Sequence, residues 1–516
     1  MKIPLTPTRF LYRAVDLYGS KTGIVSGADR FTYAQFGDRC ERLASALLRW
    51  GVRPGEPVAF LSYNTHRLLE GYFGVPMANG AVMPLNVRLT ASELGDILRH
   101  SGARLLFYEN EFAGSLETLS RTAGALREAI NLDDGYEAFL SSGDPGRIDF
   151  MTCDEDSMAE LFYTSGSMGT PKGVALTHRT IYLHALGIST GCRLADTDVE
   201  LHTIPLFHAN GWGRPQTAAM MGSKQVLVRR FDPVGVCRLI QEEGATSLSL
   251  VPTMANALLA NIEPGHYNFS SLRQVFIGGA ASSPELIGKM ERLLGCEVLA
   301  GYGLTETAPV ATTARDKCTI SFASPEERWL HKAMAGWPLP GTEIRVVDSL
   351  EADVPKDGAT FGEVIIRGDN VMESYYREPA ATADVMTGGW FHTGDMAVWD
   401  SENRIRIVDR KKEIIISGGE NISSIEVEHA IAMHPNVAEV AVVAAPDEVW
   451  GEVPVAFVVL VPNRNCSATD LRAFLDPHLA KFKMPRRFEF SSEPLPKGGT
   501  GKILKLELKN RLISLP

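Results

Sequence analysis

Cysteine is scarce in this sequence, and the seven cysteines among its 516 residues are widely scattered. None of them stands in a CxxC motif or in a Cys/His spacing that would indicate a zinc site. A nucleophilic cysteine would need a local signature, which the sequence lacks, and burial is the commoner fate of a free thiol. We therefore expect reduced thiols in the protein core.

Long hydrophobic runs and long runs of one charge are missing as well. No stretch reaches the roughly 18 apolar residues of a membrane span, and the start, "MKIPLTPTRFLYRAV", lacks the apolar core of a signal peptide. The net charge of -11 is spread along the chain, and Lys and Arg form no long run. The sequence predicts a cytoplasmic protein with no transmembrane segment and argues against nucleic acid as its main partner.

The composition is that of a folded protein, with 45% hydrophobic and 22% charged residues. The length predicts two or more domains. Up to about residue 400, apolar runs such as "VAFLSYN" (58–64) and "SLSLVPT" (247–253) alternate with helical patterns such as "RCERLASALLRWG" (39–51). This alternation is typical of an α/β protein with mainly parallel sheets flanked by helices.

The pattern changes near residue 400. The segment "RIRIVDRKKEIIISGGENISSIEVEHAI" predicts two strands around a charged cluster, a Gly-Gly turn and a helix, with Ser423 and Glu426 as a capping box. Two more strands and an amphipathic helix follow. We place the domain boundary at the charged cluster, which gives an N-terminal domain of residues 1–408 and a small C-terminal α/β domain of residues 409–516. A solvated charged turn is the plain alternative for the cluster.

The segment "YTSGSMGTPKGV" (163–174) has the composition of a phosphate-binding loop. We expect strands on both sides of it and a following helix capped by Thr177. It is not a Walker A motif, because the spacing of its glycines and lysine differs and the loop does not lead straight into a helix. Glycine amides, hydroxyl groups and one ammonium can together wrap a polyphosphate, whereas the plain alternative is a surface hairpin. The candidate phosphate ligands are Thr164, Ser165, Gly166, Ser167, Gly169, Thr170 and Lys172.

Four later segments strengthen this interpretation. They are "GYGLTET" (301–307), "WFHTGDMA" (390–397), "RIVDRKKEIIISGGENIS" (406–423) and "LPKGGTGKILK" (495–505). Together with the phosphate loop they resemble successive motifs of the adenylate-forming superfamily, which includes acyl-CoA synthetases, luciferases and the adenylation domains of peptide synthetases. The resemblance implies an acyl-CoA synthetase-like fold whose small C-terminal domain moves about a hinge at Asp409.

The reaction implied by the resemblance has two steps. A carboxylate and ATP give an acyl-adenylate and pyrophosphate, and a thiol then attacks the adenylate and releases AMP. Glu306 and Thr164 are the implied Mg²⁺ ligands, although Thr305 and Glu306 could instead begin a helix. Tyr302 resembles the aromatic residue that stacks on adenine. The other implied nucleotide contacts are Gly279, Ala280 and Ala281 along the other side of the base, and Gly301, Gly303 and Thr305.

The C-terminal motifs supply the remaining implied residues. Asp395 is expected in a short loop, where its carboxylate accepts hydrogen bonds from the ribose hydroxyls, and Arg410 reaches the same ribose. Lys502 delivers an ammonium to the reacting carboxylate and the α-phosphate, although by itself it resembles an exposed lysine in a flexible tail. The implied residues along the approach of the thiol are Gly418, Gly419 and Glu420.

The segment "LFHANGWG" (206–213) bears on the acid substrate. His208 stands where peptide-synthetase domains carry an aspartate for an amino group, which argues against an amino acid. Trp212, between Gly211 and Gly213 and close to Asn210, resembles the tryptophan that gates the acyl tunnel of fatty acyl-CoA synthetases; a core tryptophan is the plain alternative. We expect a medium- or long-chain fatty acid, with an aryl acid of the benzoate or cinnamate type, or a short-chain or sulfur-containing acid, as alternatives.

The acceptor is expected to be a free thiol, because the sequence ends shortly after Lys502 and leaves no room for a fused carrier domain. Coenzyme A is the simplest acceptor, and a carrier on another protein is the alternative. A homodimer is compatible with the resemblance. An adenylate-binding regulator without catalysis is a further alternative, against which Glu306 and Lys502 argue. Met168 stands where the family commonly has a hydroxyl residue, so we expect weaker handling of pyrophosphate.

Overall fold

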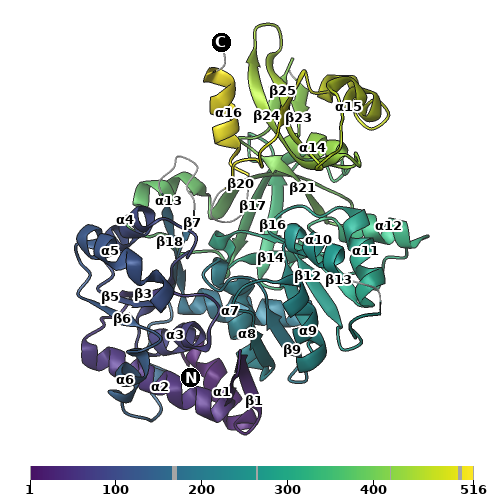
Figure 1. Ribbon diagram of the computed structural model, residues 1–516. Coiled ribbons are helices and arrows are strands. Elements are labelled where there is room, and N and C mark those ends of the chain that lie inside the picture. Colours follow the sequence, from purple (N-terminus) through teal and green to yellow (C-terminus); the bar gives the residue numbers. More distant parts are fainter. Residues whose placement is uncertain (1, 165–170, 263–264, 419, 498–502, 515–516) are drawn as a thin grey trace. The chain divides into compact units, whose positions relative to one another are not determined.

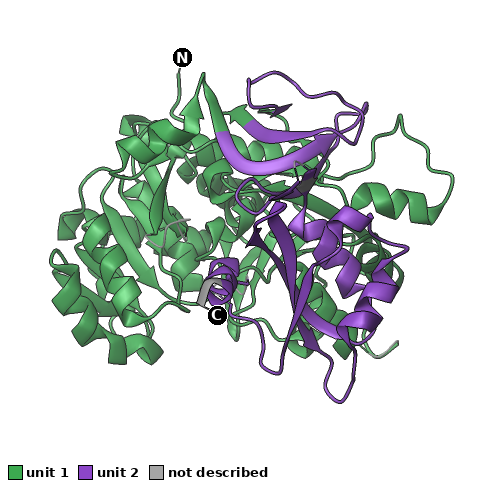
Figure 2. Ribbon diagram, turned by 90° about the horizontal axis from the view of Figure 1, so that it is seen from above, with its two compact units in different colours: residues 1–344, 366–391 green, residues 345–365, 392–516 purple. Residues whose placement is uncertain are grey.

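The computed structural model describes residues 2–164, 171–262, 265–418, 420–497 and 503–514. The chain divides into two compact units, coloured separately in Figure 2: unit 1 holds residues 1–344 and 366–391, and unit 2 holds residues 345–365 and 392–516. The chain passes from one unit to the other within strands β16 (Thr342–Val347), β17 (Phe361–Gly368) and β20 (Trp390–Trp399). The hinge predicted at Asp409 lies inside unit 2 and stays a prediction.

Two large sheets form the framework of unit 1. The seven-stranded sheet has the order β18-β8-β7-β4-β3-β5-β6, and the nine-stranded sheet has the order β15-β14-β13-β12-β11-β9-β10-β1-β2. Neighbouring strands from β13 to β1 and from β7 to β6 are parallel, which confirms the predicted fold class. The strands of the first sheet are β3 (Pro57–Leu61), β4 (Ala81–Pro84), β5 (Leu105–Tyr108), β6 (Glu128–Asn131), β7 (Met158–Thr164), β8 (Lys172–Thr177) and β18 (Ser374–Tyr375). Those of the second are β1 (Thr22–Ser26), β2 (Asp29–Thr32), β9 (Val199–His202), β10 (Lys224–Leu227), β11 (Ser247–Leu250), β12 (Gln274–Ile277), β13 (Glu297–Gly303), β14 (Val310–Thr313) and β15 (Trp337–Pro338).

Helices pack on both faces of these sheets (Figure 1). Helices α3 and α7 contact strands of both sheets and so lie between them, whereas α9, α10 and α11 cover the other face of the nine-stranded sheet. The helices of this part are α1 (Thr8–Tyr18), α2 (Tyr33–Trp50), α3 (His66–Met77), α4 (Ala91–Ser101), α5 (Leu116–Ala123), α6 (Tyr136–Ser141), α7 (His178–Cys192), α8 (Arg214–Met221), α9 (Pro233–Glu243), α10 (Pro252–Asn261), α11 (Pro284–Leu294), α12 (Pro325–Lys332) and α13 (Pro379–Val385). Short 3-10 turns are η1 (Asn110–Ser115), η2 (Phe150–Thr152), η3 (Ala209–Gly213) and η4 (Thr305–Thr307).

Polar caps set the helix starts. Thr177 accepts a hydrogen bond from the Thr180 backbone N–H at 3.1 Å, so the predicted cap of α7 is confirmed. Thr32 and Thr90 cap α2 and α4 in the same way, each with a full capping box. These three helices therefore begin where the sequence places a threonine.

Unit 2 is built mainly from antiparallel strands. Strand β21 (Ile405–Arg410) pairs with β20, which also pairs with β19 (Met386–Thr387). A second sheet has the order β23-β22-β25-β24, with β26 beside β25. Its strands are β22 (Ile415–Ser417), β23 (Glu420–Ile422), β24 (Val437–Asp447), β25 (Gly451–Leu460) and β26 (Arg487–Ser491), and its helical elements are α14 (Ser424–Ala432), α15 (Ala468–Leu475), η5 (Lys481–Lys483) and α16 (Lys505–Ser514).

The elements predicted after residue 400 are confirmed, but the predicted extent of the alternation is wrong. Between residues 310 and 410 the structure has α12 and α13 as its helices in the part that it describes, and strands make up the rest of its regular structure. Strands in this stretch, such as β20 with its neighbours β19 and β21, pair antiparallel and need no connecting helix.

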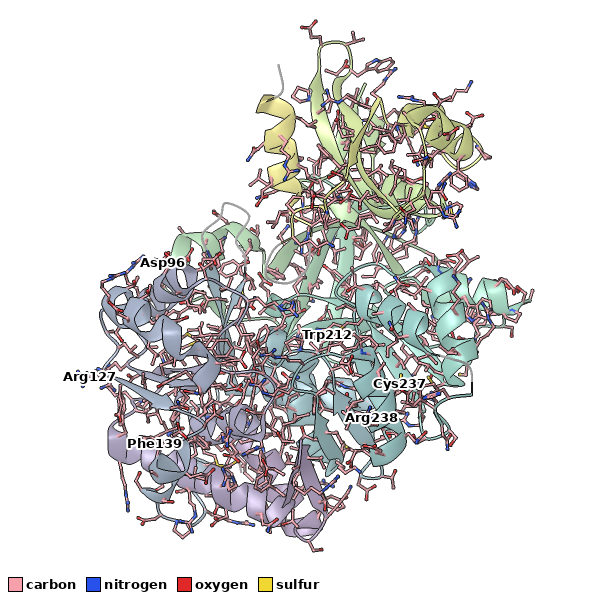
Figure 3. The ribbon with its side chains drawn as sticks, in the orientation of Figure 1. Asp96, Arg127, Phe139, Trp212, Cys237 and Arg238 are labelled. Atoms are coloured by element: carbon pink, nitrogen blue, oxygen red, sulfur yellow. The ribbon has the colours of Figure 1, made fainter. Side chains whose placement is uncertain are left out.

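The cysteines are all free, and four of the seven are buried. Burial raises the pKa of Cys192 and of Cys237 of α9 (labelled in Figure 3) to about 11. Cys318 is exposed, which corrects the expectation that all of them lie in the core. No helix within the described ranges is both long enough and apolar enough to cross a membrane.

Candidate active site

The two strands that flank the phosphate loop form an antiparallel pair. Thr164 is the last residue of β7, Lys172 is the first residue of β8, and their Cα atoms are partners in the ladder. This is the strand–loop–strand setting that the sequence predicts, and it confirms that the loop does not lead straight into a helix. Of the predicted loop residues, Ser165, Gly166, Ser167, Met168, Gly169 and Thr170 lie outside the described residues.

Glu306 and Lys172 approach the same tyrosine. The Tyr375 hydroxyl donates a hydrogen bond to Glu306 Oε1 at 2.8 Å, and Lys172 Nζ lies 4.6 Å from the centroid of the Tyr375 ring. Tyr375 is fixed by its own strand, β18, which pairs with Val174 of β8. An acidic and a basic side chain are thereby held beside the strands of the phosphate loop. Tyr375 was not predicted, because the pairing of β18 with β8 joins residues far apart in the chain.

The turn that carries Glu306 is anchored to the segment that leads into β18. The Glu306 carbonyl accepts a hydrogen bond from the Met372 N–H at 2.7 Å, and Asn370 Nδ2 donates to the Thr307 carbonyl at 3.2 Å. After Thr307 the chain continues into strand β14 rather than into a helix. Thr305 and Glu306 therefore begin only the short 3-10 turn η4 and no α-helix.

The predicted adenine contacts leave neighbouring parallel strands at the same edge of the nine-stranded sheet. Strands β12 and β13 pair in parallel from Gln274 to Ile277, and Gly279, Ala280 and Ala281 are exposed just after β12. The candidates from β13 and the turn after it are Gly301, Tyr302, Gly303 and Thr305. The carboxyl ends of parallel strands are the usual place for ligands in such sheets. The structure thus brings these two predicted segments together.

The turn η3 has an unusual backbone. Residues 209 to 213 all have positive φ, with values of 45°, 43°, 57°, 62° and 70°. A Cβ atom placed on Gly211 would lie 2.8 Å from Leu206 Cδ2, and one on Gly213 would lie 2.5 Å from the ring of His184. Both glycines are therefore required by conformation and by space. His208, which precedes the turn, is partly exposed.

Trp212, labelled in Figure 3, is partly buried against an apolar cluster. The cluster includes Phe276 of β12 and Leu299 of β13. A Cβ atom placed on Gly278 would lie 3.3 Å from Cη2 of the tryptophan ring. The ring therefore packs close to Gly278. The next residue, Gly279, is a predicted adenine contact.

A buried polar cluster lies beneath η3. Asn210 Nδ2 donates to Glu160 Oε2 at 3.0 Å, and Gln216 Nε2 donates to Glu160 Oε1 at 2.5 Å. The side chain of Glu160 is fully buried, and burial raises its pKa to about 8. Sequence analysis missed Glu160, although a single acid within the apolar strand "MAELFYT" was a usable signal.

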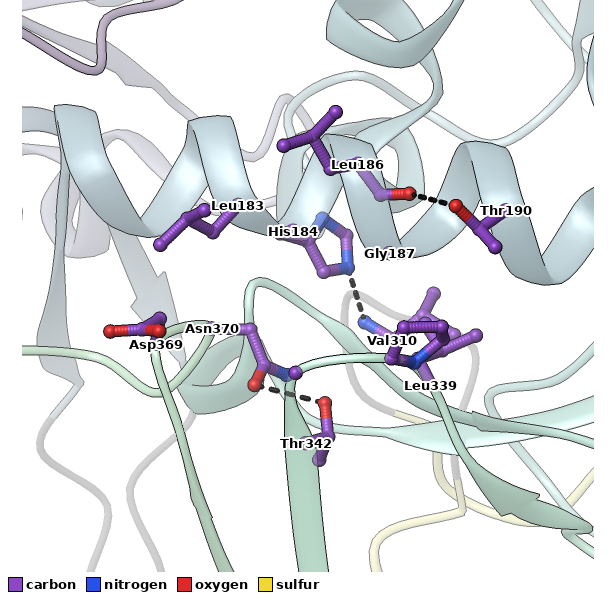
Figure 4. Close-up of a pocket in the computed structure, with 12 residues that line it drawn as sticks. Leu183, His184, Leu186, Gly187, Thr190, Val310, Leu339, Thr342, Asp369 and Asn370 are labelled. Carbon is purple, nitrogen blue, oxygen red and sulfur yellow. Dashed lines mark hydrogen bonds between the residues drawn. The ribbon is translucent and has the colours of Figure 1, made fainter.

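A cavity of about 160 Å³ lies beside α7 (Figure 4). His184 and Val310 both line this cavity, and His184 Nε2 accepts a hydrogen bond from the Val310 N–H at 3.1 Å. Burial lowers the pKa of His184 to about 3. Leu339 lines the cavity and also belongs to the cluster that packs against Trp212. None of the site residues predicted from the sequence is among its lining residues.

In unit 2, Asp395 and Arg410 form an ion pair. Arg410 Nε lies 2.7 Å from Asp395 Oδ1, and the two residues are paired across strands β20 and β21. The Asp395 side chain is 6% exposed and that of Arg410 is 51% exposed. The expectation that Asp395 lies in a short loop is wrong, because pairing with β21 extends the strand through "HTGD". The structure does bring the two predicted ribose contacts together.

Asp409, the predicted hinge residue, is buried at the start of α14. Its Oδ2 accepts a hydrogen bond from the Ser424 N–H at 2.6 Å. A carboxylate at this place is favoured by the free amide groups and the dipole of the helix. Ser423 caps the same helix, accepting from the Glu426 N–H at 3.1 Å. The reciprocal half of the predicted capping box does not form, because the Glu426 carboxylate pairs with Lys483.

The other predicted residues of unit 2 are described only in part. Gly418 has φ of 58°, and a Cβ atom placed on it would lie 2.5 Å from the ring of Trp450. Glu420 is exposed at the start of β23. Gly419 and Lys502 lie outside the described residues. The segment that contains Lys502 is bounded by a backbone bridge between Lys497 and Ile503.

Comparison with known proteins gives matches along almost the whole chain. Residues 11–376 match the AMP-binding enzyme family, and residues 426–502 match the AMP-binding enzyme C-terminal domain. A peroxisomal butyrate–CoA ligase from Arabidopsis thaliana is 36% identical over 98% of this chain and 93% of its own length. A long-chain-fatty-acid–CoA ligase from Thermus thermophilus is 36% identical over 97% of this chain and 94% of its own. A peroxisomal benzoate–CoA ligase from Arabidopsis thaliana is 35% identical over 98% and 93%.

Solved structures agree with these matches. ATP-bound MatB from Rhodopseudomonas palustris superposes with a TM-score of 0.89 at 25% identity, covering 99% of this chain and 100% of that one. An o-succinylbenzoate coenzyme A synthetase from Bacillus subtilis, in complex with ATP and magnesium ion, superposes with a TM-score of 0.84 at 27% identity, covering 98% and 99%.

Proposed function

This chain belongs to the AMP-binding enzyme family, and on that premise we propose that it is an AMP-forming acid–CoA ligase. One observation carries the proposal furthest. Tyr375 contacts both Glu306 and Lys172, so an acid and a base are held together beside the strands of the phosphate loop. A site that must join two anions needs charge neutralisation and fixed positions more than it needs a nucleophile of its own.

The proposed reaction proceeds in two displacements. An oxygen of the acid attacks the α-phosphorus of ATP, the bond to the bridging oxygen breaks, and pyrophosphate leaves. The sulfur of coenzyme A then attacks the acyl carbon, its proton passes to solvent, and AMP leaves. In the first step Lys172 and the loop amides would hold the β- and γ-phosphates, and the segments after β12 and β13 would hold adenine.

Mg²⁺ is the metal that this reaction would use, and it supplies charge neutralisation on the phosphates when bound. Within the described ranges no three His, Cys, Asp or Glu side chains are grouped so as to hold a metal ion. Mg²⁺ is commonly bound by one or two carboxylates together with substrate phosphates and water, so Glu306 fits as its ligand from this chain, with Thr164 as the hydroxyl ligand. Tyr375 would keep the Glu306 carboxylate in place.

Unit 2 would contribute the ribose contacts and Lys502. Asp395 and Arg410 already lie together, which supports their proposed joint contact with the ribose. We assign Lys502 to the first step and Gly418, Gly419 and Glu420 to the approach of the thiol. We also propose residues 1–408 and 409–516 as the two domains that move about Asp409, so that one site is rebuilt for the second step.

For the acid, we propose a medium- or long-chain fatty acid. Trp212 presents a large apolar ring beside Phe276 and Leu299, and His208 replaces the carboxylate that an amino acid would require. Relatives of nearly equal identity act, by their names, on butyrate, long-chain fatty acids and benzoate. Aryl, short-chain and sulfur-containing acids are therefore the competing substrates.

A panel of acids tests both levels of the proposal. Acetate, a series of fatty acids up to palmitate, benzoate and cinnamate are each supplied with ATP, Mg²⁺ and coenzyme A, and AMP release and thioester mass are measured. We expect thioester formation to be highest with a fatty acid of medium or long chain. A preference for benzoate or cinnamate would show that the substrate is an aryl acid and not a fatty acid. No thioester from any acid, with ATP still bound, would favour the adenylate-binding regulator.

A further inference from the structure

Glu160 is a buried carboxyl group that the proposed chemistry does not use. It lies in β7 between backbone partners in β4 and β8, and its side chain has no exposed surface. Its two oxygens accept hydrogen bonds from Asn210 of η3 and from Gln216, which is near the start of α8. One carboxyl group therefore joins two consecutive segments of the chain to the seven-stranded sheet.

The backbone that Glu160 holds is strained. The left-handed region costs roughly 1–2 kcal/mol for each residue that is not glycine. Ala209, Asn210 and Trp212 all adopt it, with φ of 45°, 43° and 62°. Contacts elsewhere must offset this cost. Asn210 makes two such contacts. Its Oδ1 accepts a hydrogen bond from the Gly213 N–H within the turn at 2.6 Å, and its Nδ2 donates one to Glu160.

The same turn places the ring of Trp212 close to Gly278 and beside Phe276. We propose that Glu160 is a positioning residue for the acid site: by binding Asn210 and Gln216 together, it holds residues 209–213 in the turn that presents Trp212. This inference rests on the proposed function only in taking Trp212 as a wall of the acid site. The hold of Glu160 on the turn is a separate claim with its own test.

The surroundings of Glu160 contain no charge to balance a carboxylate. No salt bridge to it occurs in the described part of the chain. Among titratable groups on the elements packed against β7, Tyr72 of α3 is the neighbour that it affects electrostatically. His184 of α7 faces Val310 instead, and Arg214 of α8 pairs with Glu200 at 2.7 Å. Glu160 is therefore bound by amide groups alone.

A protonated Glu160 suits this environment. Burial raises its pKa to about 8, so the carboxyl group carries its proton at neutral pH. The buried Oε1 of Gln216 has no hydrogen-bond partner among the described residues. If the nitrogen and oxygen of the Gln216 amide exchange places, the O–H of protonated Glu160 can donate a hydrogen bond to Gln216 Oε1. Ionisation above about pH 8 would leave a buried carboxylate without a cation, which opposes the closed turn.

Hydrogen exchange on the full chain tests this hold without any substrate. We compare wild type, Glu160→Gln and Glu70→Gln, following peptides that contain residues 206–217. Glutamine at 160 cannot ionise, and with the Gln216 amide turned over it keeps both hydrogen bonds, accepting from Asn210 and donating to Gln216. In wild type we expect the protection of this segment, corrected for the intrinsic effect of pH, to fall about ten-fold between about pH 7 and pH 9, and in Glu160→Gln we expect no fall.

Glu70→Gln is the matched control. Glu70 is also fully buried in unit 1, but its carboxylate is bound by Arg39 and Tyr136 and has no contact with η3. This variant should show the same pH-dependent fall as wild type. A fall of equal size in Glu160→Gln, or no fall in wild type, would overturn the proposal.

Kinetics then test the consequence for the acid. Glu160→Ala should raise KM for the acid about ten-fold, and by more than KM for ATP, since the broken network holds the turn that carries Trp212. Glu160→Gln should restore the acid KM. An unchanged acid KM in a folded Glu160→Ala protein would overturn the positioning role. If the wild type activates no acid at all, the proposed function fails, and the exchange experiment still decides whether Glu160 holds the turn.

Discussion

Two carboxylates, one in each unit, show how differently the units hold their polar groups. Glu160 of unit 1 is bound only by neutral amides, and burial raises its pKa. Burial also opposes ionisation of Glu363 in unit 2, but the ammonium of Lys411 at 2.9 Å outweighs it, and the pKa of Glu363 is lowered. Between these two groups, the partner cation of Glu363 accounts for the opposite direction of the pKa shift.

The difference extends to the proposed active site. Unit 1 holds its residues through hydrogen bonds that are buried, as at η3, or partly buried, as between Tyr375 and Glu306. Unit 2 uses ion pairs with one partner open to solvent, as with Arg410, whose side chain is 51% exposed. Contacts of the first kind are costly to break, whereas those of the second kind exchange readily with water. We therefore expect unit 1 to act as the fixed template and unit 2 to supply charges that can be withdrawn.

The largest effect should come from removing Lys502, the charge that we expect unit 2 to supply in the first step. Lys502→Ala should lower acyl-adenylate formation by about 100-fold or more, because charge stabilisation in the first step is lost. Coenzyme A transfer from a preformed acyl-adenylate should stay close to the wild-type rate. Lys497→Ala, which removes another lysine of the same segment, is the control. Undiminished adenylate formation together with slower transfer would show that Lys502 serves the second step.

Removing the fixed charge of unit 1 should have the next largest effect. Glu306→Gln should lower adenylate formation at least about ten-fold and raise the Mg²⁺ concentration needed for half-maximal rate, since a metal ligand loses its charge. A Mg²⁺ titration at saturating ATP measures this. The exposed Glu373, which lies just before β18 and Tyr375 in the chain, is the control, and Glu373→Gln should leave the titration unchanged. Equal behaviour of the two variants would contradict the role of Glu306.

The stability of unit 1 should respond to pH through Glu160. Its pKa is raised from 4.5 to about 8, so between these values the folded chain keeps a proton that the unfolded chain has lost, and wild type loses stability as pH rises. The unfolding free energy of Glu160→Gln minus that of wild type should therefore increase with pH. We expect this difference to grow by at least about 1.4 kcal/mol from the acid to the alkaline end of the range. Urea unfolding at several pH values measures the gain, and a difference that does not change with pH would refute it.

The smallest effect should come from the exposed cation of unit 2. Lys411→Ala removes the partner of Glu363, but the Lys411 side chain is 62% exposed. We expect a loss of less than about 1 kcal/mol in unfolding free energy, reduced further by salt. Because the pKa of Glu363 is lowered, this contribution is present at neutral pH and is lost as pH falls through the pKa of the folded state. A loss as large as that of a buried network would erase the contrast between the units.

Sequence alone predicted the parts of this molecule that local patterns encode. The parallel sheets, the cap at Thr177 and the strands around the phosphate loop follow from periodicity and residue type. Contacts between distant segments could not be predicted in this way. Tyr375 reaches Glu306 only because β18 pairs with β8, and Asp395 lies in a strand only because β21 pairs with it. The left-handed turn at η3 was not predicted, and the bond between Asn210 and Glu160 that holds it joins residues far apart in the chain.

The central claim is that this chain activates a carboxylic acid by transferring AMP to it. Exchange of labelled pyrophosphate into ATP, measured without coenzyme A and with the preferred acid, tests this step most directly. We predict exchange that requires both the acid and Mg²⁺ and that is lost in Lys502→Ala. Exchange that is absent with every acid, or that proceeds equally well without any acid, would contradict it.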